Sequence, residues 1–230
     1  TAVVSIPLFF MASGYLLYGK KNVTYKYSVK KIFGILRFVT IISVALWLLS
    51  GIRHGQPFFS SVLGCYFQKG NIPIFWYFGA MIILYSLFPL LHRIFREYPK
   101  FFILCTVFLC LLSNVIFIAN FFGIYIEENT IQTFRLWIWL FYFNLGGILR
   151  KYDFKSHWFG VGLLFVANFL FQYKLTLLMP TVFCEYFYSS IPVMLLSLVL
   201  FVPLVKINNN KLQFINGGAN SSCQYMHFIL

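Results

Sequence analysis

Acidic residues, and charged residues in general, are scarce in this chain. Of its 230 residues only 10% are charged and 60% are hydrophobic, and 18 Lys and Arg face just five Asp and Glu. A soluble domain carries about 25% charged residues. The composition therefore excludes an ordinary soluble domain and predicts an all-α integral membrane protein, a polytopic bundle of transmembrane helices.

The sequence also lacks the motifs of several enzyme and metal-site classes. It has no Gly-rich phosphate loop and no HExxH, and its five cysteines show neither CxxC nor Cys/His metal spacing. No Asp or Glu lies inside a long apolar run. Because proton-coupled transporters commonly use a buried acid, this absence argues against that class. We expect no metal site, no disulfide framework and no permanently bound cofactor.

The formal net charge of +13 raises the question of nucleic-acid binding, because clustered Lys and Arg neutralise phosphates. Here most basic residues lie in short loops between apolar runs. Such loops mark the cytoplasmic side of a membrane protein. We therefore expect the lipid bilayer, and no nucleic acid, as a partner of this chain.

A transmembrane helix needs about 20 apolar residues to cross ~30 Å of hydrocarbon. The chain has eight candidate spans, at about residues 1–18, 32–50, 73–91, 101–122, 134–149, 158–173, 186–205 and 212–230. The first holds Pro7, Ser13 and Gly14, which lipid tolerates only where neighbouring groups satisfy the freed backbone, so this helix is expected to face protein on at least one side. The aromatic-rich residues 57–67 fit a re-entrant or interfacial helix.

Basic residues alternate along the loops between these spans. Thirteen lie in loops 19–31, 91–100, 150–157 and 206–211, and only three lie in loops 51–72, 123–133 and 174–185. This asymmetry predicts that the first set is cytoplasmic and that Thr1 starts on the outer face. We expect one more helix before Thr1 and another after Leu230, so that residues 1–230 form a single transmembrane domain without its first and last helices.

Polar residues inside lipid are expensive and are therefore candidates for function. In the last span Asn216, Asn220, Gln224 and His227 recur every three or four residues and share one helical face. The stripe fits either a polar cavity with His227 as a proton-transferring group, or simple hydrogen bonding between helices. Scattered amides such as Asn144 fit helix packing.

Two cations lie at the start of the second span. Lys31, Gly34 and Arg37 share one face, so Lys31 and Arg37 are candidates for a paired anion site at the inner membrane boundary. Arg37 can equally well extend its charged end back to the cytoplasmic surface. Arg135, at the outer edge of the fifth span, is predicted to be an interface anchor.

Four segments, in order along the chain, resemble one known family. Residues 6–17, with the sequence IPLFFMASGYLL, closely resemble the second helix of the acyltransferase 3 family of membrane acyltransferases, which O-acetylate surface polysaccharides and related glycans. The other three are similar to later family helices: Trp76-Tyr77-Phe78 with Tyr85 and Pro89, residues 141–147 (FYFNLGG), and residues 220–227 (NSSCQYMH).

The resemblance implies transfer of an acyl group, usually acetyl from acetyl-CoA, to a hydroxyl of a cell-surface polysaccharide or its lipid-linked precursor, in a bacterial cell membrane. A His would act as general base, and His227 is the candidate within this chain. Lys31 and Arg37 would bind the CoA phosphates. The glycan would approach near four further residues, namely Ser13, Trp76, Gln224 and Tyr225.

The chain departs from the family pattern in two places. The family's proposed catalytic Arg and His stand on its first helix, which is absent from these residues, and Lys31 and Gly34 occupy the positions of an Arg-x-x-Arg pair. Two alternatives therefore stay open: a transporter or flippase of a glycan precursor, and an inactive remnant whose helices only fold and pack.

Overall fold

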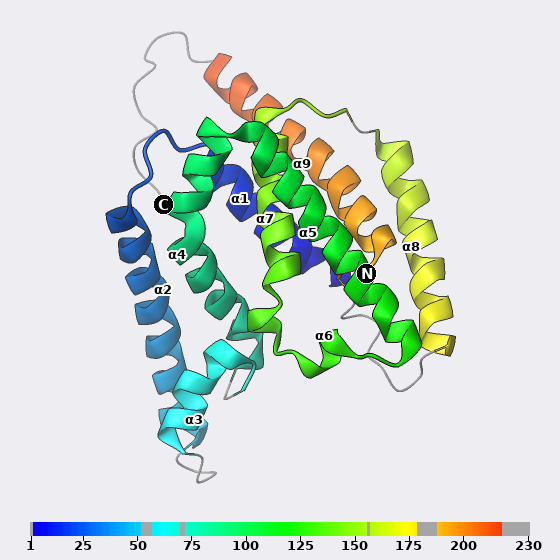
Figure 1. Cartoon of the computed structure of the whole chain (residues 1–230). Coiled ribbons are helices and arrows are strands. Elements are labelled where there is room, and N and C mark those ends of the chain that lie inside the picture. Colours follow the sequence, from blue (N-terminus) through cyan, green and yellow to red (C-terminus); the bar gives the residue numbers. More distant parts are fainter. Residues whose placement is uncertain (1, 52–56, 70–71, 156, 179–187, 218–230) are drawn as a thin grey trace.

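The computed structural model describes residues 2–51, 57–69, 72–155, 157–178 and 188–217. Within these ranges the chain forms α-helices joined by turns and short 3-10 or π segments, and it contains no strand. The expectation of an all-α helical bundle is confirmed. The long helices lie side by side, with α2 (Tyr25–Leu46) on one flank and α8 (Trp158–Leu178) on the other (Figure 1).

Most of the predicted spans coincide with helices. Besides α2 and α8, the α-helices of the described residues are α1 (Ser5–Tyr18), α3 (Phe58–Leu63), α4 (Trp76–Glu97), α5 (Pro99–Ala119), α6 (Ile126–Asn129), α7 (Leu136–Lys151) and α9 (Ile191–Gly217). Within the described residues, four helical stretches are long and apolar enough to cross a membrane, namely Tyr25–Leu49, Pro73–Glu97, Pro99–Phe122 and Trp158–Leu178. The total of eight spans stays a prediction, because the last one lies mostly outside the described residues.

Two connecting segments are helical. The aromatic-rich stretch 57–67 forms α3 and the 3-10 helix Gly64–Phe67, so its helical character is confirmed, while its re-entrant or interfacial position in the membrane stays a prediction. The prediction of a loop at residues 206–211 is wrong, because α9 runs without a break from Ile191 to Gly217. Polar residues such as Asn and Lys end an apolar run but do not end a helix, since their cost in a helix is under about 1 kcal/mol each.

The loops of each predicted side meet one another. At the basic end, the Lys20 carbonyl accepts a hydrogen bond from His92 Nε2 at 2.9 Å, and Gly19 lies against the Arg150 side chain. At the other end, Thr133 Oγ1 donates to the Tyr66 carbonyl at 2.7 Å. Figure 1 shows the α1–α2 and α4–α5 connections at the top of the bundle and α3 and α6 at the bottom. The alternating charge pattern therefore corresponds to two distinct ends of the bundle.

Helices α1 and α7 pack with their backbones in direct contact. A Cβ added to Gly14 of α1 would overlap the Phe143 carbonyl, and one added to Gly146 of α7 would overlap the Met11 carbonyl. Small residues allow this close approach in membrane bundles. The expectation that the first helix faces protein is confirmed, and Asn144 joins the same interface by accepting a hydrogen bond from Tyr18 Oη at 2.8 Å.

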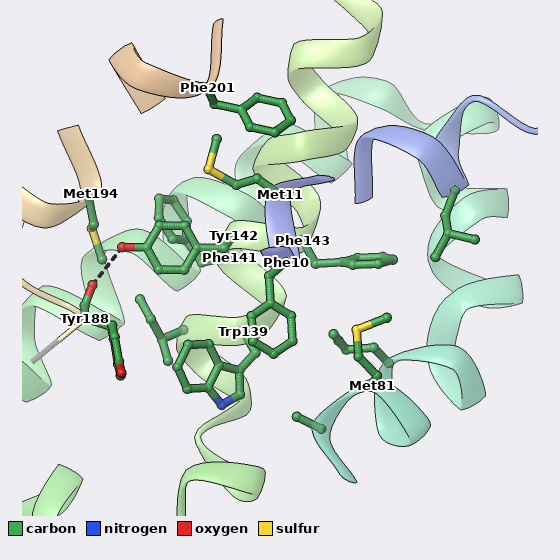
Figure 2. Close-up of a cluster of buried hydrophobic side chains, with 14 of the residues drawn as sticks. Phe10, Met11, Met81, Trp139, Phe141, Tyr142, Phe143, Tyr188, Met194 and Phe201 are labelled. Atoms are coloured by element: carbon green, nitrogen blue, oxygen red, sulfur yellow. Dashed lines mark hydrogen bonds between the residues drawn. The ribbon is translucent and has the colours of Figure 1, made fainter. Parts of the chain in front are cut away.

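Aromatic side chains fill the centre of the bundle (Figure 2). Phe10 stacks on Trp139 with ring centroids 4.8 Å apart, and Trp76 lies 5.0 Å from the same indole. Tyr142 Oη donates to the Tyr188 carbonyl at 2.7 Å, which joins α7 to the segment before α9. Three of the four segments that resemble the acyltransferase family, on α1, α4 and α7, thus meet in one core.

Candidate functional site

A cavity of about 230 Å³ opens at the basic end of the bundle. Residues 149–154 line one side of it, Tyr15 of α1 lines another, and Phe201, Val202 and Val205 of α9 line the rest. It forms where α7 ends at Lys151 and Tyr152 takes an extended conformation that leads the chain away from the helix axis. The cavity therefore combines two cations with aromatic and aliphatic walls.

Both cations of this cavity rest on aromatic rings. The Arg150 guanidinium carbon lies 4.9 Å from the Tyr15 ring centroid, and Lys151 Nζ lies 5.4 Å from the Phe95 ring centroid. Stacked in this way, a guanidinium keeps its in-plane N–H groups directed outward, where they can bind an anion. Gly19 makes room for it, since an added Cβ there would lie 3.1 Å from Arg150 Nε.

The cavity belongs to a larger basic region. Lys20 Nζ lies 4.6 Å from the Tyr27 ring centroid, and Arg96 Nη2 donates to the Lys20 carbonyl at 3.3 Å. The connections α1–α2, α4–α5 and α7–α8 therefore bring their cations together. In the sequence, Arg150 and Lys151 indicate only which side of the membrane their loop lies on. Tyr15 is far from them in the chain, so no local sequence pattern predicts the cavity.

Lys31 and Arg37, the predicted CoA-binding cations, lie on α2 and do not line this cavity. Arg37 is exposed, and a Cβ added to Gly34 between them would have no neighbour within 4 Å. The face that these two cations share is thus open in the described structure. Their role in binding CoA stays a prediction.

Two of the predicted glycan-binding residues lie within the described residues: Ser13 lies on α1, and Trp76 is the first residue of α4. Ser13 Oγ and Tyr77 Oη are 3.2 Å apart and hydrogen-bonded, and Trp76 is buried with 4% of its surface exposed. The structure brings these residues near one another, since Phe10 contacts both Tyr77 and Trp139, the neighbour of Trp76. The remaining predicted site residues, Gln224, Tyr225 and His227, lie outside the described residues.

A buried carboxylate at the opposite end of the bundle was not singled out from the sequence. Glu127 of α6 is 2% exposed, and it accepts hydrogen bonds from Ser189 Oγ and, at 3.5 Å, from Asn120 Nδ2. Burial raises the pKa of Glu127, while Ser189, Arg135 and Asn120 favour its ionised form and limit the rise. The hydrogen bond between Glu127 and Ser189 links α6 to the residues just before α9.

Arg135 is a second buried charged residue at the same end of the bundle as Glu127. It is 6% exposed, and its Nε donates to the Thr130 carbonyl at 2.9 Å. The prediction of a simple interface anchor is therefore wrong, because the side chain is enclosed by protein. Across the described ranges, no three His, Cys, Asp or Glu side chains gather in a way that could hold a metal ion.

Comparison with known proteins adds one match. The model of the acyltransferase 3 family, described as an acyltransferase domain, matches residues 2–230. No curated protein and no solved structure matches the chain. The match covers nearly all the residues and agrees with the ordered segments on α1, α4 and α7 that meet in the core. The chain belongs to the acyltransferase 3 family of membrane acyltransferases.

Proposed function

We propose that this protein transfers an acetyl group from acetyl-CoA to a hydroxyl of a cell-surface polysaccharide or of its lipid-linked precursor, in a bacterial cell membrane. The observation that carries the proposal is the family match over residues 2–230, together with the helical bundle that the described residues form. The cationic cavity at the basic end supports the choice of an anionic, water-soluble donor that arrives from the cytoplasm.

The reaction needs a general base, an acyl thioester and a path between the two ends of the bundle along which the donor and the acceptor can meet. The acceptor oxygen attacks the thioester carbonyl, the carbon–sulfur bond breaks, and the hydroxyl proton passes through the base to the CoA sulfur. We propose His227 as a base within this chain, with Ser13, Trp76, Gln224 and Tyr225 near the acceptor. The Ser13 and Tyr77 hydroxyls, which are hydrogen-bonded to each other beside the aromatic core, would supply hydroxyl partners for a sugar, and the buried Trp76 precedes Tyr77 in α4.

Labelled acetyl-CoA tests the function directly. Membranes from cells that express the protein are incubated with acetyl-CoA carrying a radioactive acetyl group, and base-labile label in extracted glycans is counted. Ester label that depends on the protein supports acyl transfer. Movement of a glycan precursor across the membrane without any ester would identify a transporter or flippase instead, and the absence of both activities would identify an inactive remnant.

The predicted role of the α2 cations has its own test. We expect Lys31→Ala combined with Arg37→Ala to raise the KM for acetyl-CoA, because two phosphate-binding charges are lost, while kcat changes little. Lys26→Ala, on the same helix, is the matched control for loss of charge. An unchanged KM in the double variant would remove both residues from the donor site.

A further inference from the structure

The cavity at the end of α7 is lined by charged, aromatic and aliphatic side chains together. The difference in charge between the two ends of the bundle does not require such a combination. Cations in the last turn of a helix normally serve only to balance its dipole. Here Arg150 and Lys151 instead border a hollow that also presents Tyr152, Phe154 and the carboxylate-bearing Asp153. Tyr152 and Phe154 are each 42% exposed, so flat aromatic surface is available at the opening.

The shape of the cavity limits what it can accept. Its volume of about 230 Å³ is below the roughly 300–1,000 Å³ of pockets that enclose whole drug-sized ligands. One part of a large ligand would fit, while the rest extends outside. The side of the hollow formed by Phe201, Val202 and Val205 is apolar and does not suit a strongly hydrated group.

The chemistry of the lining matches the parts of a phosphorylated nucleotide. A guanidinium binds phosphate oxygens through paired N–H donors, and Arg150 is held ready by its stacking on Tyr15. An exposed tyrosine or phenylalanine ring offers a stacking surface for a purine base. Asp153 can accept hydrogen bonds from ribose hydroxyls or an exocyclic amine. A phosphatidylglycerol headgroup would use the cations, but it carries no planar ring that could stack on the aromatic surface.

We propose that this cavity binds the nucleotide end of the acyl donor, with Arg150 and Lys151 on phosphate and Tyr152 or Phe154 against the base. The proposal rests on the proposed function, because it takes acyl-CoA as the donor. It moves the principal donor contact from α2 to the end of α7, next to the α1–α7 interface.

Binding of adenosine 3′,5′-bisphosphate, the nucleotide portion of CoA, tests the proposal. The full-length protein is placed in nanodiscs of phosphatidylcholine, and the Kd of the bisphosphate is measured by equilibrium dialysis. We expect Arg150→Gln to raise the Kd by about 10- to 100-fold, which is the range for losing a charge-assisted hydrogen-bonded contact. Lys155→Gln, which removes a nearby exposed charge that does not line the cavity, should change the Kd by less than about threefold.

A second variant keeps the test informative if Arg150→Gln does not fold. Tyr152→Ser removes an exposed ring beyond the end of α7, and the loss of base stacking should raise the Kd several-fold. The proposal is overturned if the Kd is unchanged in both variants, or if Lys155→Gln weakens binding as much as Arg150→Gln does.

Two further readouts separate the alternatives. If Arg150→Gln leaves bisphosphate binding intact but lowers the retention of phosphatidylglycerol in mixed nanodiscs, the cavity is a lipid-headgroup site and the nucleotide assignment is wrong. Normal acetyl transfer with an unaffected Kd would refute the cavity assignment alone. Bisphosphate binding that depends on Arg150, in a protein that transfers no acetyl group, would support the cavity and refute the proposed function.

Discussion

Replacing Gly146 by alanine should strongly destabilise the bundle. The added Cβ would overlap the backbone carbonyl of Met11 on α1 and come within 2.9 Å of the Tyr15 backbone nitrogen. Both obstacles are backbone atoms, so a change of rotamer cannot relieve them. The two helices would have to separate, and the stacking between Phe10 and Trp139 would be disturbed with them.

The magnitude follows from the kind of clash. Inserting one methyl group into a well-packed core costs typically 1–3 kcal/mol, and occasionally more. Because no flexible side chain can move aside, we place Gly146→Ala at the upper end, about 3 kcal/mol. A change of this size multiplies the unfolding equilibrium constant by more than about 100.

Gly162→Ala provides the matched control. Gly162 lies in the second turn of α8, and a Cβ added there would have no neighbour within 4 Å. Since alanine is favoured over glycine in a helix by up to about 1 kcal/mol, this variant should be neutral or slightly stabilising. Both variants are unfolded in detergent micelles and followed by tryptophan fluorescence. If Gly146→Ala unfolds no more easily than Gly162→Ala, the close α1–α7 contact is not formed as described.

Two other predictions concern buried groups. Burial raises the pKa of Glu127, so the folded state holds a proton more tightly than the unfolded state, and stability should fall as pH rises from the ordinary Glu range to the raised pKa, by up to about 1.4 kcal/mol per pH unit. When the free energy of unfolding is measured across that pH range, its slope should disappear in Glu127→Gln. The slope should remain in Glu128→Gln, whose side chain is exposed. A slope that persists in Glu127→Gln would belong to another titrating group. Trp139→Phe should destabilise the protein by about 3 kcal/mol, because it leaves the Gln132 carbonyl without the indole N–H that lies 2.6 Å away and opens a void beside Phe10. Thermal unfolding would measure this loss, and an equal loss in Trp158→Phe, at the exposed start of α8, would contradict the argument.

The candidate site was only partly predictable from the sequence. The sequence singles out Gly14 as a residue that needs protein neighbours and Gly146 as part of a segment that resembles the family, and the structure places α1 and α7 against each other at these residues. The cavity was missed because its walls come from separate parts of the chain: Tyr15 of α1 lies more than a hundred residues before α7, and α9 begins about 40 residues after α7 ends. Periodicity within one helix carries no information about such a meeting.

Buried polar groups show the same limit. Glu127 and Arg135 stand in sequence like ordinary loop and interface residues, yet the fold encloses both. Enclosure is tolerated because Ser189, Asn120 and the Thr130 carbonyl supply hydrogen bonds. Asn120 and the Thr130 carbonyl lie within seven residues of the groups they bind, but Ser189 lies 62 residues from Glu127, and only the fold brings it there.

The sequence by itself determined the membrane class, the helical secondary structure, the two ends of the bundle and the family. These features follow from local properties, namely the length of apolar runs, the alternation of basic loops and short ordered motifs. The tertiary structure alone decided that α1 and α7 touch backbone to backbone and that Arg150 stacks on Tyr15 at the edge of a cavity. These features depend on contacts between helices far apart in the chain, and only the packed bundle brings those helices together.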